Sequence, residues 1–132
     1  MAMARYASKV SGLYPADAAE AVSVDMVSET ILDLLSGFID MKFTTDAILK
    51  AEKAAKYIAE GIPKGLAALE GLVKGKYFCD ESATMADLHL FDVVQNALTS
   101  TFPELSMVSF PKLNAIVEAI KANTNIAAYL SK

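Results

Sequence analysis

The sequence has few of the residues that carry metal and redox chemistry. Its 132 residues include one cysteine and one histidine. A single cysteine excludes an internal disulfide, and one cysteine with one histidine excludes an ordinary zinc site. We therefore expect no bound metal and no cofactor. Because disulfides mark oxidising compartments, the sequence favours a reducing one, and we expect a cytoplasmic protein.

Positive charge and long apolar runs are also scarce. Lysine and arginine together number 12 against 16 aspartates and glutamates, a net charge of −4. No local basic run appears, so we expect no nucleic-acid partner. No apolar run approaches the roughly 18 residues of a membrane span, so we expect no membrane partner either. The opening residues 1–9 lack the apolar core of a signal peptide.

What remains is an apolar, helical pattern. The chain is 54% hydrophobic with only 6 glycines and 4 prolines, which excludes disorder and fits one domain. Apolar residues recur with the helical period, and no stretch alternates as a strand does. The sequence therefore predicts an all-α fold with two long antiparallel helices and shorter helices packed beside them.

The first two predicted helices lie in residues 1–43. A short helix over Met1–Ser11 has no N-terminal cap and stops at Gly12, a residue that adopts the left-handed conformation readily. Pro15 and Asp17 open a long helix that runs to about Phe43. Its apolar face contains residues three and four apart: Val24, Val27, Ile31, Leu34, Phe38 and Met41.

A second long helix is predicted from the Thr44–Asp46 cap to Gly75. Pro63 removes one helical N–H and should kink this helix. Residues 76–83 are predicted to be a loop, and further helices are expected from Thr84, over about 112–122 and over 126–130. The apolar stripe of the second long helix comprises Ile48, Ala51, Ala55, Ile58, Ile62, Leu66, Leu69 and Val73.

Thr84 and Asp87 have the spacing of a capping box at the start of the helix that is expected from Thr84. The threonine hydroxyl can accept from the N3 amide, while the carboxylate reaches back to the N-cap amide. This pattern is specific for a folding signal and by itself indicates no activity. A ligand-binding role for Asp87 is the less favoured alternative.

Asp25, Glu29 and Asp33 form an acidic row at positions i, i+4 and i+8. Like charges at this spacing destabilise a helix by a few tenths of a kcal/mol each. Such a row is usually a solvated face. The alternative is that a cation meets it, either a ligand ammonium or an arginine of a partner.

The two residue types that often serve as nucleophile or base give weak signals here. His89 has no visible orienting acid, and we interpret it as a structural residue. Cys79 stands beside two acids that would raise the pKa of its thiol, so a nucleophilic role is not favoured. From these residues alone, the sequence indicates an acidic all-α domain without a defined reaction.

Six segments are in the right order along nearly the whole chain: Gly12–Pro15, Ala21–Leu34, Tyr77–Phe78, Ser82–Leu88, Phe110–Leu113 and Asn123–Leu130. Together they resemble the C-terminal domain of glutathione S-transferases, with the sigma and pi classes nearest. Tyr77–Phe78 followed by Ser82–Leu88 looks like that family's F-x-G-x-x-x-T-x-A-D capping stretch. A minor departure is Asp80, which follows Cys79 where the family commonly has glycine and then aspartate.

The resemblance implies specific roles for a few residues. Asp33 matches an acid that crosses the dimer interface toward the α-amino group of glutathione in the other subunit. Phe43 matches a position that often lines the hydrophobic substrate site, with Phe38 close by. Residues 1–132 would form one C-terminal-like domain, of which 1–11 resemble the last helix of a thioredoxin-like domain. The remainder of that glutathione-binding domain, including its activating residue, is not in this sequence.

Two functions from different classes follow from the resemblance. The first is the helical part of a detoxifying glutathione transferase, which supplies the wall of the electrophile site and the interface of a homodimer. Glutathione would be its co-substrate and a hydrophobic electrophile its second substrate, but this chain alone is expected to be inactive. The alternative is a non-catalytic scaffold or protein-interaction module. An acid aimed at a ligand amine favours the enzyme, and the absent domain favours the scaffold.

Overall fold

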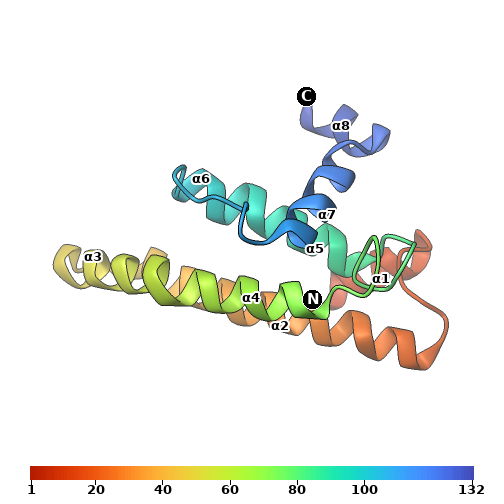
Figure 1. Ribbon diagram of the computed structural model, residues 1–132, viewed down its shortest axis with the longest axis horizontal. Coiled ribbons are helices and arrows are strands. Elements are labelled where there is room, and N and C mark those ends of the chain that lie inside the picture. The colour runs from red at the N-terminus through yellow and green to blue at the C-terminus, as the bar shows by residue number, and fades with distance from the viewer.

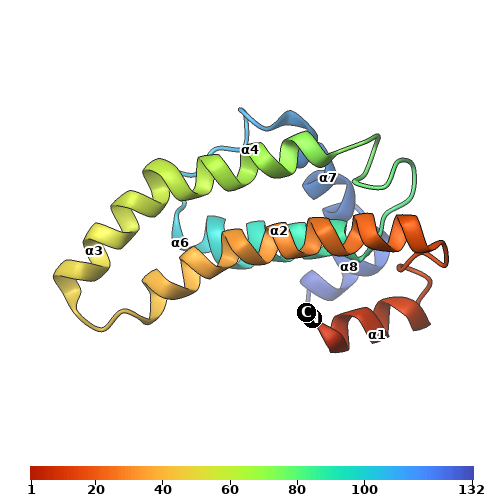
Figure 2. The same cartoon turned by 90° about the horizontal axis from the view of Figure 1, so that it is seen from below.

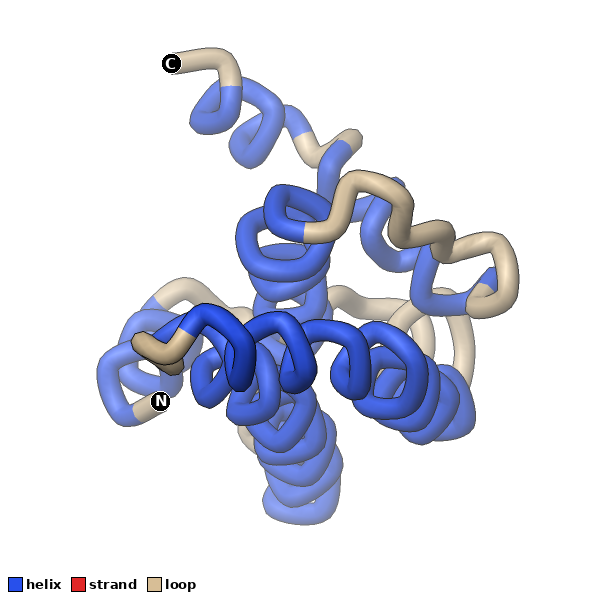
Figure 3. Tube along the Cα trace, turned by 90° about the vertical axis from the view of Figure 1, so that its left-hand side faces the viewer, coloured by secondary structure: helices blue, strands red, loops and turns tan.

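The computed structural model describes residues 1–132 and consists of helices joined by loops (Figure 1, Figure 3). Its only β-type pairing is an isolated bridge between Tyr77 and Asp80. The predicted all-α fold is therefore confirmed. The elements are α1 (Ala2–Val10), α2 (Ala18–Phe43), α3 (Ala47–Lys56), the π-helical η1 (Tyr57–Gly61), α4 (Ile62–Leu72), α5 (Met85–Asp92), the π-helical η2 (Val93–Leu98), α6 (Thr99–Thr101), α7 (Pro111–Lys121) and α8 (Thr124–Leu130).

Helix α2 agrees closely with its prediction. Asp17 is its N-cap, and the carboxylate accepts hydrogen bonds from the N–H groups of Ala19 and Glu20 at 3.0 Å each. Five of the six residues of the predicted face are buried, and Phe38 is half-buried. The face packs against α4 and α5, so α2 is the central element of the bundle.

The second long helix is continuous but bent, and it runs antiparallel to α2 (Figure 2). Its helical part ends at Leu72, three residues before the predicted Gly75. The bend coincides with η1, which ends two residues before Pro63. Because proline cannot donate to the carbonyl four residues earlier, a wider π turn there accommodates the irregularity.

Only the second half of the predicted stripe on this helix lies in the core. Ile62, Leu66, Leu69 and Val73 are buried, but every stripe residue before η1 is exposed. The π turn inserts an extra residue into the helical period, which brings Tyr57 inward in place of Ile58. The prediction of one continuous buried face on this helix was therefore wrong.

A second layer of helices covers the pair formed by α2 and α4 (Figure 1). Helix α5 lies on α2, and α7 packs against both α4 and α5. Glu70 of α4 caps α7: its two carboxylate oxygens accept from the N–H groups of Lys112 and Leu113 at 2.9 Å each. This contact joins the two layers at the start of α7.

The two terminal helices lie at the edge of the bundle. Helix α1 contacts α5 and ends before Gly12, whose φ of +75° is the predicted left-handed conformation. The following residue, Leu13, accepts a hydrogen bond from the N–H of Met85 at 2.9 Å, which fixes the segment after α1 to the start of α5. Helix α8 contacts α7 and projects from the body with the C-terminus (Figure 3).

Candidate functional site

The acidic row on α2 meets a cation from the same chain. Arg5 Nε donates to Asp25 Oδ1 at 2.8 Å, and an Arg5 terminal nitrogen lies 3.5 Å from Glu29 Oε1. The Tyr14 hydroxyl donates to Asp25 Oδ2 at 3.0 Å. Partial burial acts to raise the pKa of Asp25, but the hydrogen bonds from Arg5 and Tyr14 outweigh it and lower that pKa. For Asp25 and Glu29, the cation that meets the acidic row is therefore Arg5 of the same chain, and not a ligand ammonium or an arginine of a partner.

Asp33, the third acid of the row, is exposed and its carboxylate makes no hydrogen bond or ion pair. It lies one turn beyond Glu29, at the edge of a cleft of about 350 Å³ between α2 and α4. Lys64 and Gly61 line the opposite side of that cleft. Asp33 therefore remains available to a cation from outside the chain, in contrast to its two neighbours.

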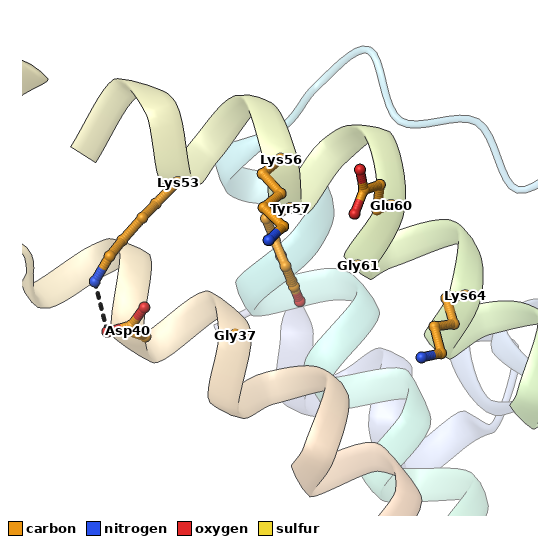
Figure 4. A pocket seen from close by; sticks show the side chains of 8 residues that line it. All are labelled: Gly37, Asp40, Lys53, Lys56, Tyr57, Glu60, Gly61 and Lys64. Atoms are coloured by element: carbon orange, nitrogen blue, oxygen red, sulfur yellow. Dashed lines mark hydrogen bonds and ion pairs between the residues drawn. The ribbon is translucent and has the colours of Figure 1, made fainter. Parts of the chain in front are cut away.

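A second cleft of about 280 Å³ continues the same groove toward the hairpin end (Figure 4). The two clefts share Gly61 and Lys64. Lys53 and Asp40 face each other across the groove and form an ion pair of 2.8 Å, whereas Lys56 and Lys64 have no acidic partner. The groove thus has Asp33 at one end, and lysines together with the carboxylates of Asp40 and Glu60 toward the other.

Tyr57 forms the floor of this second cleft. Its ring lies against two glycines, since an added Cβ would come within 2.8 Å of the ring at Gly37 and within 2.6 Å at Gly61. Its hydroxyl donates to the carbonyl of Leu34 at 2.7 Å. Burial raises the pKa of Tyr57 to about 12, so this hydroxyl stays protonated at neutral pH.

The structure does not bring Phe38 and Phe43 together. Phe38 is half-buried against the core, with Lys42 Nζ 5.9 Å from the centre of its ring. Phe43 is 79% exposed at the end of α2. Phe43 comes five positions after Phe38 in the helix, so the two side chains project about 140° apart. Neither residue lines the clefts at Asp33 and Tyr57.

Thr84 and Asp87 form both halves of a capping box at the start of α5. Asp87 is fully buried, and its Oδ2 accepts from the Thr84 N–H at 2.8 Å and the Thr84 hydroxyl at 2.9 Å. Its other oxygen accepts from the N–H of Phe78 at 3.0 Å. Burial raises the pKa of Asp87, although these hydrogen bonds oppose the effect. The carboxylate faces the interior and is not available to a ligand.

His89 lies in another cleft, of about 340 Å³, between α1 and α5. Its Nδ1 is buried without a hydrogen-bond partner, and burial lowers the pKa of the imidazole. The thiol of Cys79 is half-buried; burial and the charge of Asp87 raise its pKa. No group of three or more potential ligand side chains is close enough to hold a metal ion.

Sequence reasoning missed two residues of this region. Arg5 is the only arginine in the chain. The signal that could have found it is that a chain with an acidic row contains a single arginine. Tyr57 lies outside the predicted apolar stripe, and its inward position depends on η1, for which Pro63 was the one hint. No pattern in the sequence indicates that Gly37 and Gly61 lie against its ring.

Comparison with known proteins agrees with the helical arrangement. The sequence profile of the family described as "Glutathione S-transferase, C-terminal domain" matches residues 32–132. The chain is 28% identical over 136 residues to a glutathione S-transferase of Anopheles gambiae, a match that covers 100% of this chain and 66% of the relative. It is 24% identical over 148 residues to S-crystallin 4 of Enteroctopus dofleini, covering 100% and 67% of the two chains.

Solved structures show the same fold. A prostaglandin synthase D of Nilaparvata lugens matches with a TM-score of 0.91 at 19% identity, over 99% of this chain and 66% of that one. A glutathione transferase homologue from Sulfitobacter, solved with bound glutathione, matches with a TM-score of 0.71 at 20% identity, over 91% and 66%.

The chain belongs to the glutathione S-transferase C-terminal domain family. It spans about two thirds of the length of the curated relatives it matches. No helix is long and apolar enough to cross a membrane.

Proposed function

We propose that this chain is the helical C-terminal part of a glutathione transferase, in which it contributes the wall of the electrophile site and part of the interface of a homodimer. Residues 1–132 would act as one unit, with residues 1–11 belonging by descent to a thioredoxin-like domain. Glutathione would be the co-substrate and a hydrophobic electrophile the second substrate.

The observation that carries this proposal is the isolation of Asp33. Arg5 holds Asp25 and Glu29, yet the third acid of the same row is exposed and unpaired at the rim of a cleft. An unpaired carboxylate there is suited to bind an ammonium group, and glutathione carries one at its α-carbon. Since a lone exposed ion pair contributes at most about 1 kcal/mol, Asp33 can orient glutathione but cannot bind it alone.

The groove between α2 and α4 supports a two-fold subunit contact on this face. Asp33 lies at one end of the groove, Lys56 lies toward the other beside Glu60, and Lys64 lines both clefts. A two-fold axis across this face would bring Asp33 of one copy opposite Lys56 of the other, so that the same surface serves both subunits of an isologous interface. The same pairing would bring Asp33 near a ligand held by the second subunit.

Two tyrosines of this chain, Tyr14 and Tyr57, are poorly suited to activate the glutathione thiol. Conjugation needs a thiolate, which a hydroxyl donor with a free proton can stabilise at the sulfur. The Tyr57 hydroxyl is committed to the Leu34 carbonyl, and the Tyr14 hydroxyl to Asp25. Burial raises the pKa of both phenols. We infer that the activating group comes from a thioredoxin-like domain outside these residues.

The proposal is tested by restoring such a domain. A chimera carries the thioredoxin-like part of the Anopheles gambiae relative ahead of residues 1–132, so that Arg5 still holds Glu29, and is assayed for conjugation of glutathione to a chromogenic aryl halide. We expect turnover from the chimera and none from the 132-residue chain. Asp33→Asn should raise the KM for glutathione, and Glu29→Gln, one turn away on the same helix, should leave it unchanged. If Asp33→Asn leaves the KM for glutathione unchanged in a folded chimera, the role assigned to Asp33 is refuted.

A scaffold function is the second candidate, and the separation of Phe38 from Phe43 favours it. Two aromatic side chains on different sides of α2 do not form a shared apolar wall. A folded chimera without conjugating activity would favour the scaffold over the enzyme, whereas self-association abolished by Lys64→Glu fits both candidates.

A further inference from the structure

Helices α2 and α4 approach each other closely at the level of Asp33. A Cβ added to Gly65 of α4 would lie 2.8 Å from Leu34 Cδ1 of α2, so the Leu34 side chain fills the space that a larger residue would take. Leu34 is buried and directly follows Asp33 in the chain. The position of Asp33 therefore depends on how Leu34 is held against the opposite helix.

Tyr57 holds Leu34 from the opposite helix by a hydrogen bond. Its side chain points toward α2 (Figure 4), and its hydroxyl donates to the Leu34 carbonyl at 2.7 Å. This is the only side-chain hydrogen bond between α2 and the segment formed by η1 and α4. Because burial raises the pKa of Tyr57 to about 12, the donor persists through neutral and mildly alkaline pH. One buried donor thus ties α2 to the opposite helix one residue from Asp33.

The spacing of the two helices decides whether Asp33 stays free. Lys64 of α4 lines the same cleft, and no ion pair joins it to Asp33. Because a lysine ammonium sits on a flexible four-carbon stem, a narrower groove would let it reach the carboxylate. Arg5 shows the consequence of such a contact, since it already occupies Asp25 and Glu29 of the same row. A fixed distance between α2 and α4 keeps Asp33 available to a cation from outside the chain.

We propose that Tyr57 is a positioning residue for Asp33, which it holds at a fixed distance from α4 through the Leu34 carbonyl. This inference rests on the proposed role of Asp33 toward the ammonium group of glutathione. Tyr57 acts through the backbone of α2 and not by contact with glutathione, since its hydroxyl is already bonded to Leu34. Loss of that hydroxyl should therefore weaken the binding of glutathione without slowing the reaction of its thiol, which belongs to a different residue of the tripeptide.

The test compares Tyr57→Phe with Asp33→Asn in the active chimera. Tyr57→Phe removes the hydroxyl and keeps the ring. It should raise the KM for glutathione severalfold, as Asp33→Asn does, and leave kcat at saturating glutathione unchanged. Because Tyr57 acts through Asp33, the double variant should have the KM of Asp33→Asn alone.

A second measurement uses the 132-residue chain and needs no activity. Hydrogen exchange at the amides of residues 34–38 should be severalfold faster in Tyr57→Phe, because this turn of α2 loses its tie to the opposite helix. Unchanged exchange there would overturn the proposal, since the hydroxyl would then not fix the turn.

Tyr14→Phe is the matched control. It removes a hydroxyl that donates to Asp25 of the same helix, about two turns before Asp33. It should leave the KM for glutathione and the exchange of residues 34–38 unchanged, and circular dichroism should show both phenylalanine variants folded.

The outcomes separate this inference from the proposed function. A raised KM in Asp33→Asn beside an unchanged KM in Tyr57→Phe would overturn the positioning role and leave the proposed function in place. Independent effects on KM that multiply in the double variant, or a loss of kcat alone in Tyr57→Phe, would also overturn it. If Asp33→Asn itself leaves the KM unchanged, the proposed role of Asp33 fails and the inference fails with it.

Discussion

Replacement of Asp87 by alanine should destabilise the fold strongly, because this side chain satisfies three donors at once. Its carboxylate accepts from the N–H groups of Phe78 and Thr84 and from the Thr84 hydroxyl, all within 3.0 Å. The residue is completely buried, so water cannot replace these bonds. The substitution removes the N3 half of the capping box and detaches the loop before α5.

The size of the effect follows from what is left unpaired. A buried donor without a partner costs about 1–3 kcal/mol, and two backbone N–H groups would lose theirs. The Thr84 hydroxyl can rotate to another acceptor, and removal of a buried carboxylate relieves its own desolvation. The net loss should be about 2–4 kcal/mol, a large share of the stability of an ordinary domain.

The loss of stability in Asp87→Ala is measured by urea unfolding, with circular dichroism as the signal. The midpoint of Asp87→Ala should fall by about 1–2 M relative to the unchanged chain, with a similar slope. Lys121→Ala on the exposed side of α7 is the control and should leave the midpoint in place. If both variants unfold at the same urea concentration, Asp87 acts as an ordinary surface carboxylate and the reasoning fails.

The same pair of proteins tests the pKa of Asp87. Because burial raises this pKa in the folded state, the folded chain binds a proton more readily than the unfolded chain between the two pKa values. The contribution of Asp87 to stability is therefore largest below the unfolded pKa of about 4 and declines as pH rises through the folded pKa. The midpoint gap between the unchanged chain and Asp87→Ala should narrow from acid toward neutral pH. A gap that widens instead would mean a lowered pKa.

Three further predictions concern other contacts. Gly61→Ala should lower the free energy of unfolding by about 1–3 kcal/mol, because its Cβ would meet the Tyr57 ring at 2.6 Å. Gly71→Ala, in α4 with open space around it, should raise the free energy of unfolding by about 0.5–1 kcal/mol. Melting temperatures that shift in the same direction for both variants would contradict this. His89 has a pKa lowered by burial, so stability should fall as pH drops below about 6.5, and His89→Leu should flatten that dependence in melts at neutral and mildly acid pH. Glu70→Ala should lower the urea midpoint by the equivalent of about 1–2 kcal/mol, because two N–H groups at the start of α7 lose their acceptor, and an unchanged midpoint would show that water replaces it.

Most of the fold could be predicted from local patterns. The N-cap at Asp17, the stop at Gly12 and the capping box at Thr84 depend on residues within a few positions of one another, and the structure contains all three. The apolar face of α2 could also be predicted, because its helix is regular over its whole length. The cation that meets the acidic row could not be predicted, because Arg5 approaches Asp25 only after the chain turns between α1 and α2.

The π turn of η1 explains most of what periodicity could not predict. A helical wheel assumes one period from end to end, and a single inserted residue rotates everything before it relative to everything after. Tyr57 becomes the floor of a cleft, Gly37 and Gly61 become necessary for its ring, and Ile48 and Ile58 turn to solvent. The candidate cleft and the exposure of Ile48 and Ile58 thus share one cause. A variant that restores a regular helix at this point should alter both together.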